Sequence, residues 1–307
     1  MGNENVIKTC SCIGYGAVGR PFLHGLRQTG VMVKGVALRN KSPHREIALA
    51  DAIPVFPLHA LPLAVDLLIL AVPDDQIEKI ATILAHRANN HHPAPQIGLN
   101  SMNPRVAMHF SGRFGIVPLT PLTEKGWLRL AWHPIQTFPK DVDSRRFQGI
   151  VVGVTADEDA QPMASELAQR LGTTTWQVRE KDRAHYHLAA VLASNFLPVL
   201  CSLAASRLAS VVKESGEAIR GLLPLVEGMI ENLKLLTPAE AMTGPVVRND
   251  LEAVRQHLQG WENIQDRVLY LKLLEAAVDL AQQGGRLQAE QAASWKRFLQ
   301  LYLDDIK

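Results

Sequence analysis

The sequence predicts a doubly wound α/β domain over residues 1–180, followed by an all-helical domain over residues 181–307. In the first half, short strand-like apolar runs alternate with amphipathic stretches, which is typical of βαβ units and a parallel sheet. The first apolar run leads directly into a turn with the spacing Gly14-x-Gly16-x-x-Gly19. Strand signals cease after about Asp182. A chain of 307 residues is long enough for two domains that each bury a core.

The first strand is expected at Val6 to Ile13, and the helix after the glycine turn ends at Thr29-Gly30. A second strand follows at Val31 to Leu38, and a weak third one lies near Val55. The run from Asp66 to Val72 is continuously apolar, as in a strand buried on both faces. Further strands are expected at residues 96–99, 128–132, 150–154 and 174–178.

The second half of the chain is predicted to be entirely helical. The expected helices cover residues 183–212, 215–235, 249–259, 263–282 and 287–304. The uncharged stretch 188–206 is about long enough to span a bilayer. It contains Asn195, Pro198 and Ser202, so we interpret it as a central helix buried inside the helical domain and expect no membrane partner.

The three glycines have distinct steric roles in a Rossmann domain. Gly14 permits the tight turn, Gly16 lets the backbone approach a pyrophosphate, and Gly19 lets the helix pack closely on the strand. The helix N-terminus then offers free N–H groups to the phosphates. The turn thus predicts a dinucleotide site to which Tyr15, Ala17 and Val18 also belong; the alternative is a tight turn with no ligand.

Cationic and hydrogen-bonding side chains follow the second strand. An NAD-selective site usually has an acidic residue there, which accepts hydrogen bonds from the ribose. This chain has Arg39, Asn40, Lys41 and Ser42 instead, which suits a 2′-phosphate and favours NADP(H). The alternative is a solvated basic loop.

Val72, Pro73 and Asp74 close the fourth strand at the carboxyl edge of the sheet, where ligands of such sheets bind. We expect them to line the cofactor. The alternative is that Pro73 only ends the strand and Asp74 only caps the next helix, without contact to a cofactor.

Candidate chemistry begins at His133, which follows a predicted strand and so should face the same edge. It could bind a substrate carboxylate or donate a proton, or its ring could only fix the turn before Pro134. His187 and Ser194 lie on one face of a helix with Asn195 alongside. These polar groups must either satisfy one another or meet a ligand.

Thr243 and Arg248 form a further cluster, in which Arg248 could clamp a carboxylate and Thr243 could donate to it. The alternative is a turn followed by a cap at Asn249 or Asp250. His86, His91 and His92 have no spaced carboxylate or cysteine beside them, so we predict a solvated loop and no metal site.

Composition excludes several classes of function. The net charge of +2, with Lys and Arg scattered among Asp and Glu, argues against a nucleic-acid partner. Three cysteines cannot pair completely, and the N-terminus has no signal-peptide pattern. A reduced cytoplasmic location is therefore expected.

These motifs together resemble a known family. The chain combines Gly14-x-Gly16-x-x-Gly19, Val72-Pro73-Asp74, His133-Pro134, a helix from Tyr186-His187 to Ser194-Asn195, and Thr243-Gly244-Pro245. This combination is similar to Rossmann-plus-helical proteins described as predicted NADP- or deazaflavin-dependent oxidoreductases, whose C-terminal half is a domain of unknown function. The likeness runs from residue 6 to about 258. In that family Arg-Gly-Asp usually follows the Thr-Gly-Pro turn, whereas this chain has Arg248-Asn249-Asp250.

The resemblance implies wider relatives: pyrroline-5-carboxylate reductase, 6-phosphogluconate and β-hydroxyacid dehydrogenases, and prephenate dehydrogenase. It implies NADP held by Gly14, Gly16, Gly19, Arg39 and Asn40, a small substrate lined by His133, His187, Asn195 and Thr243 in an interdomain cleft, and a homodimer formed through the C-terminal helices. A likeness to prephenate dehydrogenase is weak, because Asn195 or a neighbouring residue stands where that enzyme has a catalytic histidine in the helix, and an amide cannot act as a base. The function expected is an NADP(H)-dependent oxidoreductase with His133 and Asn195 as catalytic candidates; the alternative is an NADP(H) sensor without turnover.

Overall fold

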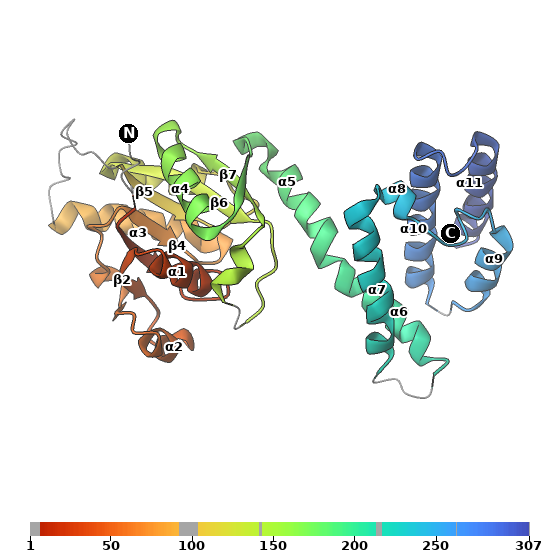
Figure 1. Ribbon diagram of the computed structural model, residues 1–307, viewed down its shortest axis with the longest axis horizontal. Coiled ribbons are helices and arrows are strands. Elements are labelled where there is room, and N and C mark those ends of the chain that lie inside the picture. Colours follow the sequence, from red (N-terminus) through yellow and green to blue (C-terminus); the bar gives the residue numbers. More distant parts are fainter. Residues whose placement is uncertain (1–6, 92–103, 141–142, 213–216, 262, 307) are drawn as a thin grey trace. The chain divides into compact units, whose positions relative to one another are not determined.

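We describe a computed structural model of the chain, covering residues 7–91, 104–140, 143–212, 217–261 and 263–306 (Figure 1). The chain divides into two compact units, residues 1–195 and 196–307. The first unit holds the whole sheet and the second is helical, so the predicted fold class, α/β followed by all-α, is confirmed.

The first unit is built on an eight-stranded sheet with the order β3-β2-β1-β4-β5-β6-β7-β8. Strands β1 to β6 are parallel, whereas β7 pairs antiparallel with β6 and parallel with β8. The strands are β1 (Thr9–Ile13), β2 (Met32–Ala37), β3 (Val55–Phe56), β4 (Leu67–Leu70), β5 (Arg105–His109), β6 (Trp127–Pro134), β7 (Val151–Ala156) and β8 (Thr174–Gln177).

Helices cover both faces of this sheet. Successive residues of β4 alternate between the two cores, which is why its sequence is continuously apolar. One core is shared by α1 (Gly19–Gln28) and α4 (Gln161–Leu171), and the other by α3 (Asp74–His91) and the 3₁₀ segment η2 (Val117–Lys125). The remaining helical segments of the unit are α2 (His44–Ala50), η1 (Leu58–Ala60), η3 (Ser144–Phe147), η4 (Glu158–Ala160), η5 (Glu180–Asp182), α5 (Arg183–Ala190) and the π-turn η6 (Val191–Asn195).

The sheet differs from the predicted one at its fifth strand. The expectation missed β5, where Arg105 and His109 flank an apolar run of only three residues. The strand expected at residues 96–99 lies outside the described residues. The strands expected after it are present as β6, β7 and β8.

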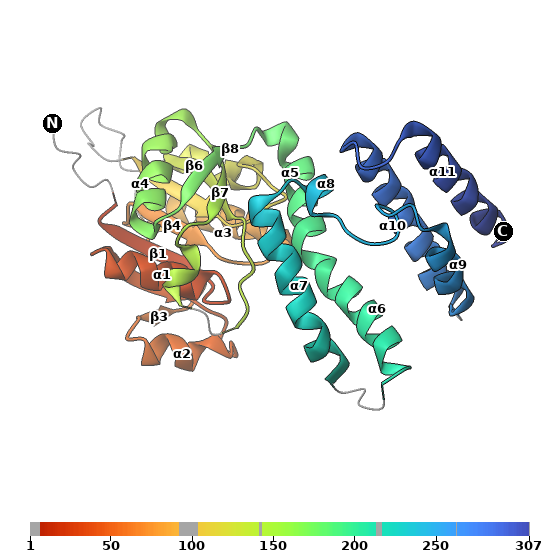
Figure 2. The same ribbon diagram turned by 45° about the vertical axis from the view of Figure 1, so that its right-hand side comes forward.

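The second unit contains α6 (Leu197–Ala209), α7 (Ala218–Leu235), α8 (Pro238–Ala241), α9 (Leu251–Gln259), α10 (Ile264–Gln283) and α11 (Ala289–Asp304). Its core lies between α9, α10 and α11 around Trp295. Helices α6 and α7 lie side by side (Figures 1 and 2). The Thr237 side chain and Glu240 form a capping box that starts α8, and Asp250 caps α9.

The long apolar stretch is not the buried central helix that the sequence suggested. It is interrupted by the π-turn at residues 191–195 and restarts with Pro198 in the first turn of α6. Several of its large apolar side chains are exposed, including Leu188, Leu192, Phe196 and Val199. Among the described helices, the stretch Glu180–Ala209 alone is long and apolar enough to cross a membrane.

Candidate active site

The candidate site lies along the carboxyl edge of the parallel strands. In the sheet, β1 lies between β2 and β4, so the chain leaves β1 at the point where the strand order reverses. This is where open α/β sheets bind their ligands. The glycine turn after β1, the basic loop after β2 and the Ala71–Asp74 segment after β4 all meet there.

Two of the three glycines are required by the protein's own packing. Gly14 has a φ of +94°, and a Cβ there would lie 2.1 Å from the Ala71 carbonyl oxygen. A Cβ on Gly19 would lie 2.8 Å from the Ala71 Cβ. Both glycines therefore allow the turn and α1 to lie against the end of β4.

Gly16 has no such reason to be glycine. Its φ is outside the left-handed region, and apart from its chain neighbours the nearest atom to a Cβ there would be His44 Nε2 at 4.0 Å. The space in front of Gly16 is therefore open to a ligand that approaches the backbone. This is the position at which a Rossmann turn meets a pyrophosphate.

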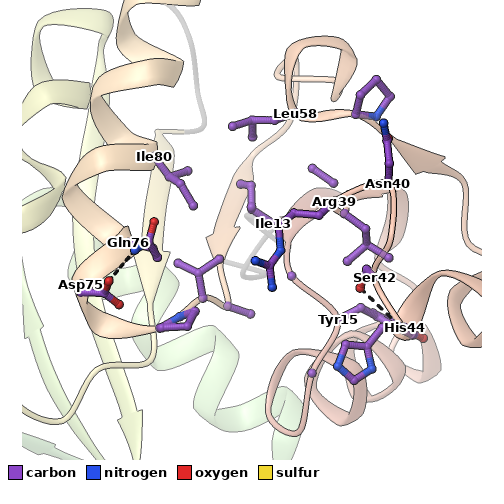
Figure 3. A pocket seen from close by; sticks show the side chains of 18 residues that line it. Ile13, Tyr15, Arg39, Asn40, Ser42, His44, Leu58, Asp75, Gln76 and Ile80 are labelled. Carbon is purple, nitrogen blue, oxygen red and sulfur yellow. Dashed lines mark hydrogen bonds between the residues drawn. The ribbon is translucent and has the colours of Figure 1, made fainter.

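A pocket of about 910 Å³ opens beside the turn (Figure 3). Arg39 extends its guanidinium into the middle of this pocket, and Asn40 and Ser42 lie at its rim (Figure 3). Eight of the predicted cofactor residues line it: Gly14, Tyr15, Gly16, Arg39, Asn40, Ser42, Val72 and Pro73. Ala17, Val18, Gly19 and Asp74 do not.

His44 is a lining residue that the sequence analysis missed. It starts α2, its backbone N–H donates to Ser42 Oγ at 3.3 Å, and its ring lies beside the glycine turn (Figure 3). His44 reaches the pocket only because α2 folds back over the turn, so no local sequence pattern predicts it as a lining residue.

The side chain of Tyr15 holds the glycine turn in place. Its side chain is buried, and its hydroxyl donates to Asp51 Oδ2 at 2.8 Å and lies 2.9 Å from His24 Nε2. Arg20 Nε donates to the same carboxylate oxygen at 3.0 Å. Burial, followed by the hydrogen bond to Asp51, raises the Tyr15 pKa, so the hydroxyl stays protonated as a donor. Tyr15 thus lines the pocket, and its side chain fixes the turn to the end of α2.

Asp74 points toward the loop after β5 instead of the pocket. Its Oδ2 accepts from Ser111 Oγ at 2.8 Å, and Ser111 Oγ accepts from the Phe114 N–H. His109 accepts from the Ser111 N–H at Nδ1 and so donates from Nε2 to the Gly115 carbonyl at 2.7 Å. Asp74 and His109 together fix the loop that carries Gly112.

His133, Tyr186 and His187 form a second cluster at this edge. His133 Nδ1 lies 2.7 Å from the Tyr186 hydroxyl, and the rings of His133 and His187 stand 6.3 Å apart between centroids. Arg183, Tyr186 and His187 share one face of α5 because they are three and four residues apart. A Cβ on Gly112 would lie 2.8 Å from His133 Nε2 and 2.7 Å from His187 Cδ2. Glycine at 112 is therefore required because both rings pack closely against its backbone.

Burial is the main cause that lowers the pKa of His133 to about 4, and the charge on Arg183 adds to it. His133 is thus neutral at pH 7, a state that favours hydrogen bonding over donation of a proton.

The remaining predicted substrate residues are Ser194, Asn195, Thr243 and Arg248. Ser194 and Asn195 are in the π-turn, where the Ser194 hydroxyl lies 2.8 Å from both the Ala190 carbonyl and Asn195 Oδ1. These two polar groups thus contact each other and the local backbone. Thr243 and Arg248 belong to the second unit and are exposed there. No group of three potential metal ligands occurs in the part of the chain that the structure describes.

Acid should destabilise the first unit before its carboxylates titrate. Burial lowers the pKa of His109 from the ordinary 6.5 to about 4, so the folded protein rejects a proton that the unfolded chain accepts. Stability is therefore lost as the pH falls from 6.5 toward 4, by about 3 kcal/mol for this one histidine. Denaturant unfolding across this pH range measures the slope, and His109→Gln should flatten it. A free energy of unfolding that stays constant between pH 6.5 and 4.5 would contradict this assignment.

Comparison with known proteins agrees with this architecture. Residues 6–134 match the Rossmann-like domain, and residues 150–277 match a domain of unknown function, DUF2520. No curated protein matches the sequence.

Among solved structures, a candidate NADP oxidoreductase from Bacteroides fragilis is similar, with a TM-score of 0.70 at 19% identity over 91% of this chain and 100% of that one. A protein from Thermotoga maritima has a TM-score of 0.65 at 24% identity over 90% and 99%. The 1-pyrroline-5-carboxylate reductase of Streptococcus pyogenes has a TM-score of 0.54 at 16% identity over 95% and 96%. The fold is therefore that of nicotinamide-dinucleotide oxidoreductases, and the chain joins a Rossmann-like domain to a DUF2520 domain.

Proposed function

We propose that the protein is an NADP(H)-dependent oxidoreductase that acts on a small carboxylate-bearing metabolite. The observation that carries the proposal is Gly16, a glycine that the protein's own packing does not require and that lies at the mouth of a large pocket. A ligand that must approach the backbone explains it. NADP(H) fits this place because the turn presents N–H groups at the start of α1.

Arg39 is the main support for NADP(H) over NAD(H). Its guanidinium points into the pocket, and no acidic residue lines the pocket on the side of β2. A 2′-phosphate would accept hydrogen bonds from Arg39, with Asn40 and Ser42 as further donors. Bound NADPH would supply a hydride to the substrate.

His133 and His187 are the groups we assign to the substrate. Both lie at the carboxyl edge in the first unit, close to the loop that Asp74 holds. As a neutral ring, His133 would orient the substrate through a hydrogen bond. We assign Asn195, Thr243 and Arg248 to the wall of the substrate site on the strength of the family resemblance.

Turnover tests this proposal. Purified protein with NADPH should consume the cofactor in the presence of small keto or imino acids, followed by the absorbance of NADPH, and the corresponding amides should react far more slowly. Clear NADPH binding without turnover on any such acid would instead support an NADP(H) sensor. The low pKa of His133 favours that alternative, because it leaves the site without an evident proton donor at pH 7.

We propose that a second copy of this chain covers the exposed apolar faces of α6 and α7. Large side chains exposed on these helices include Val199, Leu200, Leu223, Leu225 and Leu233. An exposed patch of this kind marks an interface with another protein or a membrane. The helical stretch contains Arg183, which is buried against β6 and β7, so inserting the whole stretch in a bilayer would pull Arg183 away from the sheet. A soluble, cytoplasmic dimer fits these constraints better.

Leu225→Glu should shift the protein from dimer to monomer in analytical ultracentrifugation. The side chain is 71% exposed, so the charge leaves the isolated chain folded but desolvates in an interface. Val117→Glu, at a side chain 60% exposed in the first unit, is the matched control and should leave the mass unchanged. A monomeric wild type, or binding to lipid vesicles that Leu225→Glu abolishes, would overturn the dimer.

A further inference from the structure

The imidazole ring of His44 lies beside the glycine turn with its hydrogen-bonding capacity unused. The residue is half-buried at the start of α2, and its Nε2 lies 4.0 Å from the place where a Cβ on Gly16 would stand. The backbone N–H of His44 donates to Ser42 Oγ at 3.3 Å, whereas the ring has no hydrogen-bond partner among the described residues. Both ring nitrogens are therefore available to a ligand in the pocket that His44 lines.

Helix α2 holds this ring in a fixed place. Ala48 is fully buried in the core of the sheet, and Ile47 packs against the same core. At the end of the helix, the Asp51 carboxylate accepts from the hydroxyl of Tyr15, which belongs to the glycine turn. Because α2 has only seven residues, these contacts also fix its first residue, His44, against the turn.

The charges around the ring leave it free for an anion. Asp51 forms ion pairs with Arg20 and His24, and no carboxylate of the described residues pairs with His44. The acidic residue of the pocket lining, Asp75, belongs to α3 and lies across the pocket from His44 (Figure 3). The side of the pocket next to the glycine turn therefore presents hydrogen-bond donors without a competing carboxylate.

We propose that His44 donates a hydrogen bond from Nε2 to the pyrophosphate of the bound dinucleotide, and so completes a phosphate subsite with the backbone of Gly16. The inference rests on the proposed function and deepens it, because it assigns a side chain to the pyrophosphate. A phosphate is larger than the absent Cβ, so a phosphate seated against the Gly16 backbone extends its oxygens toward the ring. Hydrogen bonds to such an anion are among the strong ones.

His44 and Arg39 thus have different roles in the same pocket. The pyrophosphate is common to NADPH and NADH, so His44 contributes affinity for both. The 2′-phosphate is present only in NADPH, so Arg39 contributes the preference between them. This difference separates the two residues experimentally.

Calorimetric titrations with NADPH and NADH, at fixed ionic strength, test the role of His44. His44→Leu should weaken both complexes by the same factor, about tenfold, because it removes one hydrogen bond to a charged group. His44→Gln, whose amide can still donate, should keep most of the affinity. The matched control is His59→Leu, which removes an exposed histidine next to the lining residue Leu58 and should leave both affinities unchanged.

Phosphorus NMR of bound NADPH shows which phosphate His44 meets, because the pyrophosphate and the 2′-phosphate give separate signals. His44→Leu should move the pyrophosphate signals and leave the 2′-phosphate signal in place, and Arg39→Ala should do the reverse. A shift of the 2′-phosphate signal alone in His44→Leu would overturn the assignment.

The same titrations distinguish failure of this inference from failure of the proposed function. Wild-type affinity of His44→Leu for both cofactors, or a loss confined to NADPH, overturns the pyrophosphate role of His44 and leaves the proposed function standing. Absence of NADPH binding by the wild-type protein would overturn the proposed function itself, and the inference with it.

Discussion

Gly16→Val should abolish NADPH binding, with a loss of at least about a hundredfold in affinity, and leave the protein as stable as the wild type. A Cβ at residue 16 would lie no closer than 4.0 Å to any atom beyond its chain neighbours. The substitution should therefore leave the stability of the fold unchanged. The valine side chain would block a phosphate that must approach the backbone of residue 16. A hundredfold loss of affinity corresponds to about 2.7 kcal/mol of binding free energy. Calorimetric titration with NADPH and thermal unfolding without it measure the two effects.

Gly14→Ala is the matched comparison for Gly16→Val. Its Cβ would lie 2.1 Å from the Ala71 carbonyl oxygen at a φ of +94°, so this smaller substitution should lower the thermal stability markedly. The two glycines thus separate a packing role from a ligand role. Normal NADPH affinity in Gly16→Val would show that the open space in front of Gly16 is not the pyrophosphate site.

Arg39→Ala should weaken NADPH binding by about tenfold to a hundredfold and leave NADH binding nearly unchanged. Hydrogen bonds to a charged group contribute about 1.5–3 kcal/mol, and only NADPH carries the 2′-phosphate that Arg39 would meet. Titrations of both cofactors at fixed ionic strength measure the ratio of their affinities.

Arg145→Ala controls for the loss of a positive charge in general. Its side chain is 80% exposed in the first unit and pairs with Asp143, so both affinities should stay at the wild-type values. If Arg39→Ala weakened the binding of NADPH and NADH equally, Arg39 would contact a part of the molecule that both cofactors share.

The part of the site that lies on contiguous residues could be predicted from the sequence. The glycine spacing and the basic residues after the second strand are local patterns, and the structure places Gly14, Gly16, Arg39, Asn40 and Ser42 around one pocket. Their roles follow from strand, turn and helix in immediate succession. The fold class follows from the same alternation of apolar periods.

The rest depends on packing between distant segments. Arg183 reads in sequence as one of several charged residues at a surface turn, and only the docking of α5 on β6 and β7 buries it. His44 reaches the glycine turn because α2 folds back, and Tyr186 reaches His133 across 53 residues of chain. The exposure of Leu192 and its neighbours was likewise not predictable, since a buried helix and an interface helix have the same composition.

The most direct test of the central claim is a pair of calorimetric titrations of the wild-type protein, one with NADPH and one with NADH. The pocket, the open face of Gly16 and the guanidinium of Arg39 predict a 1:1 complex with NADPH that is at least about tenfold tighter than the complex with NADH. Equal affinities would contradict the role of Arg39, and absence of binding by both would contradict the nucleotide site itself.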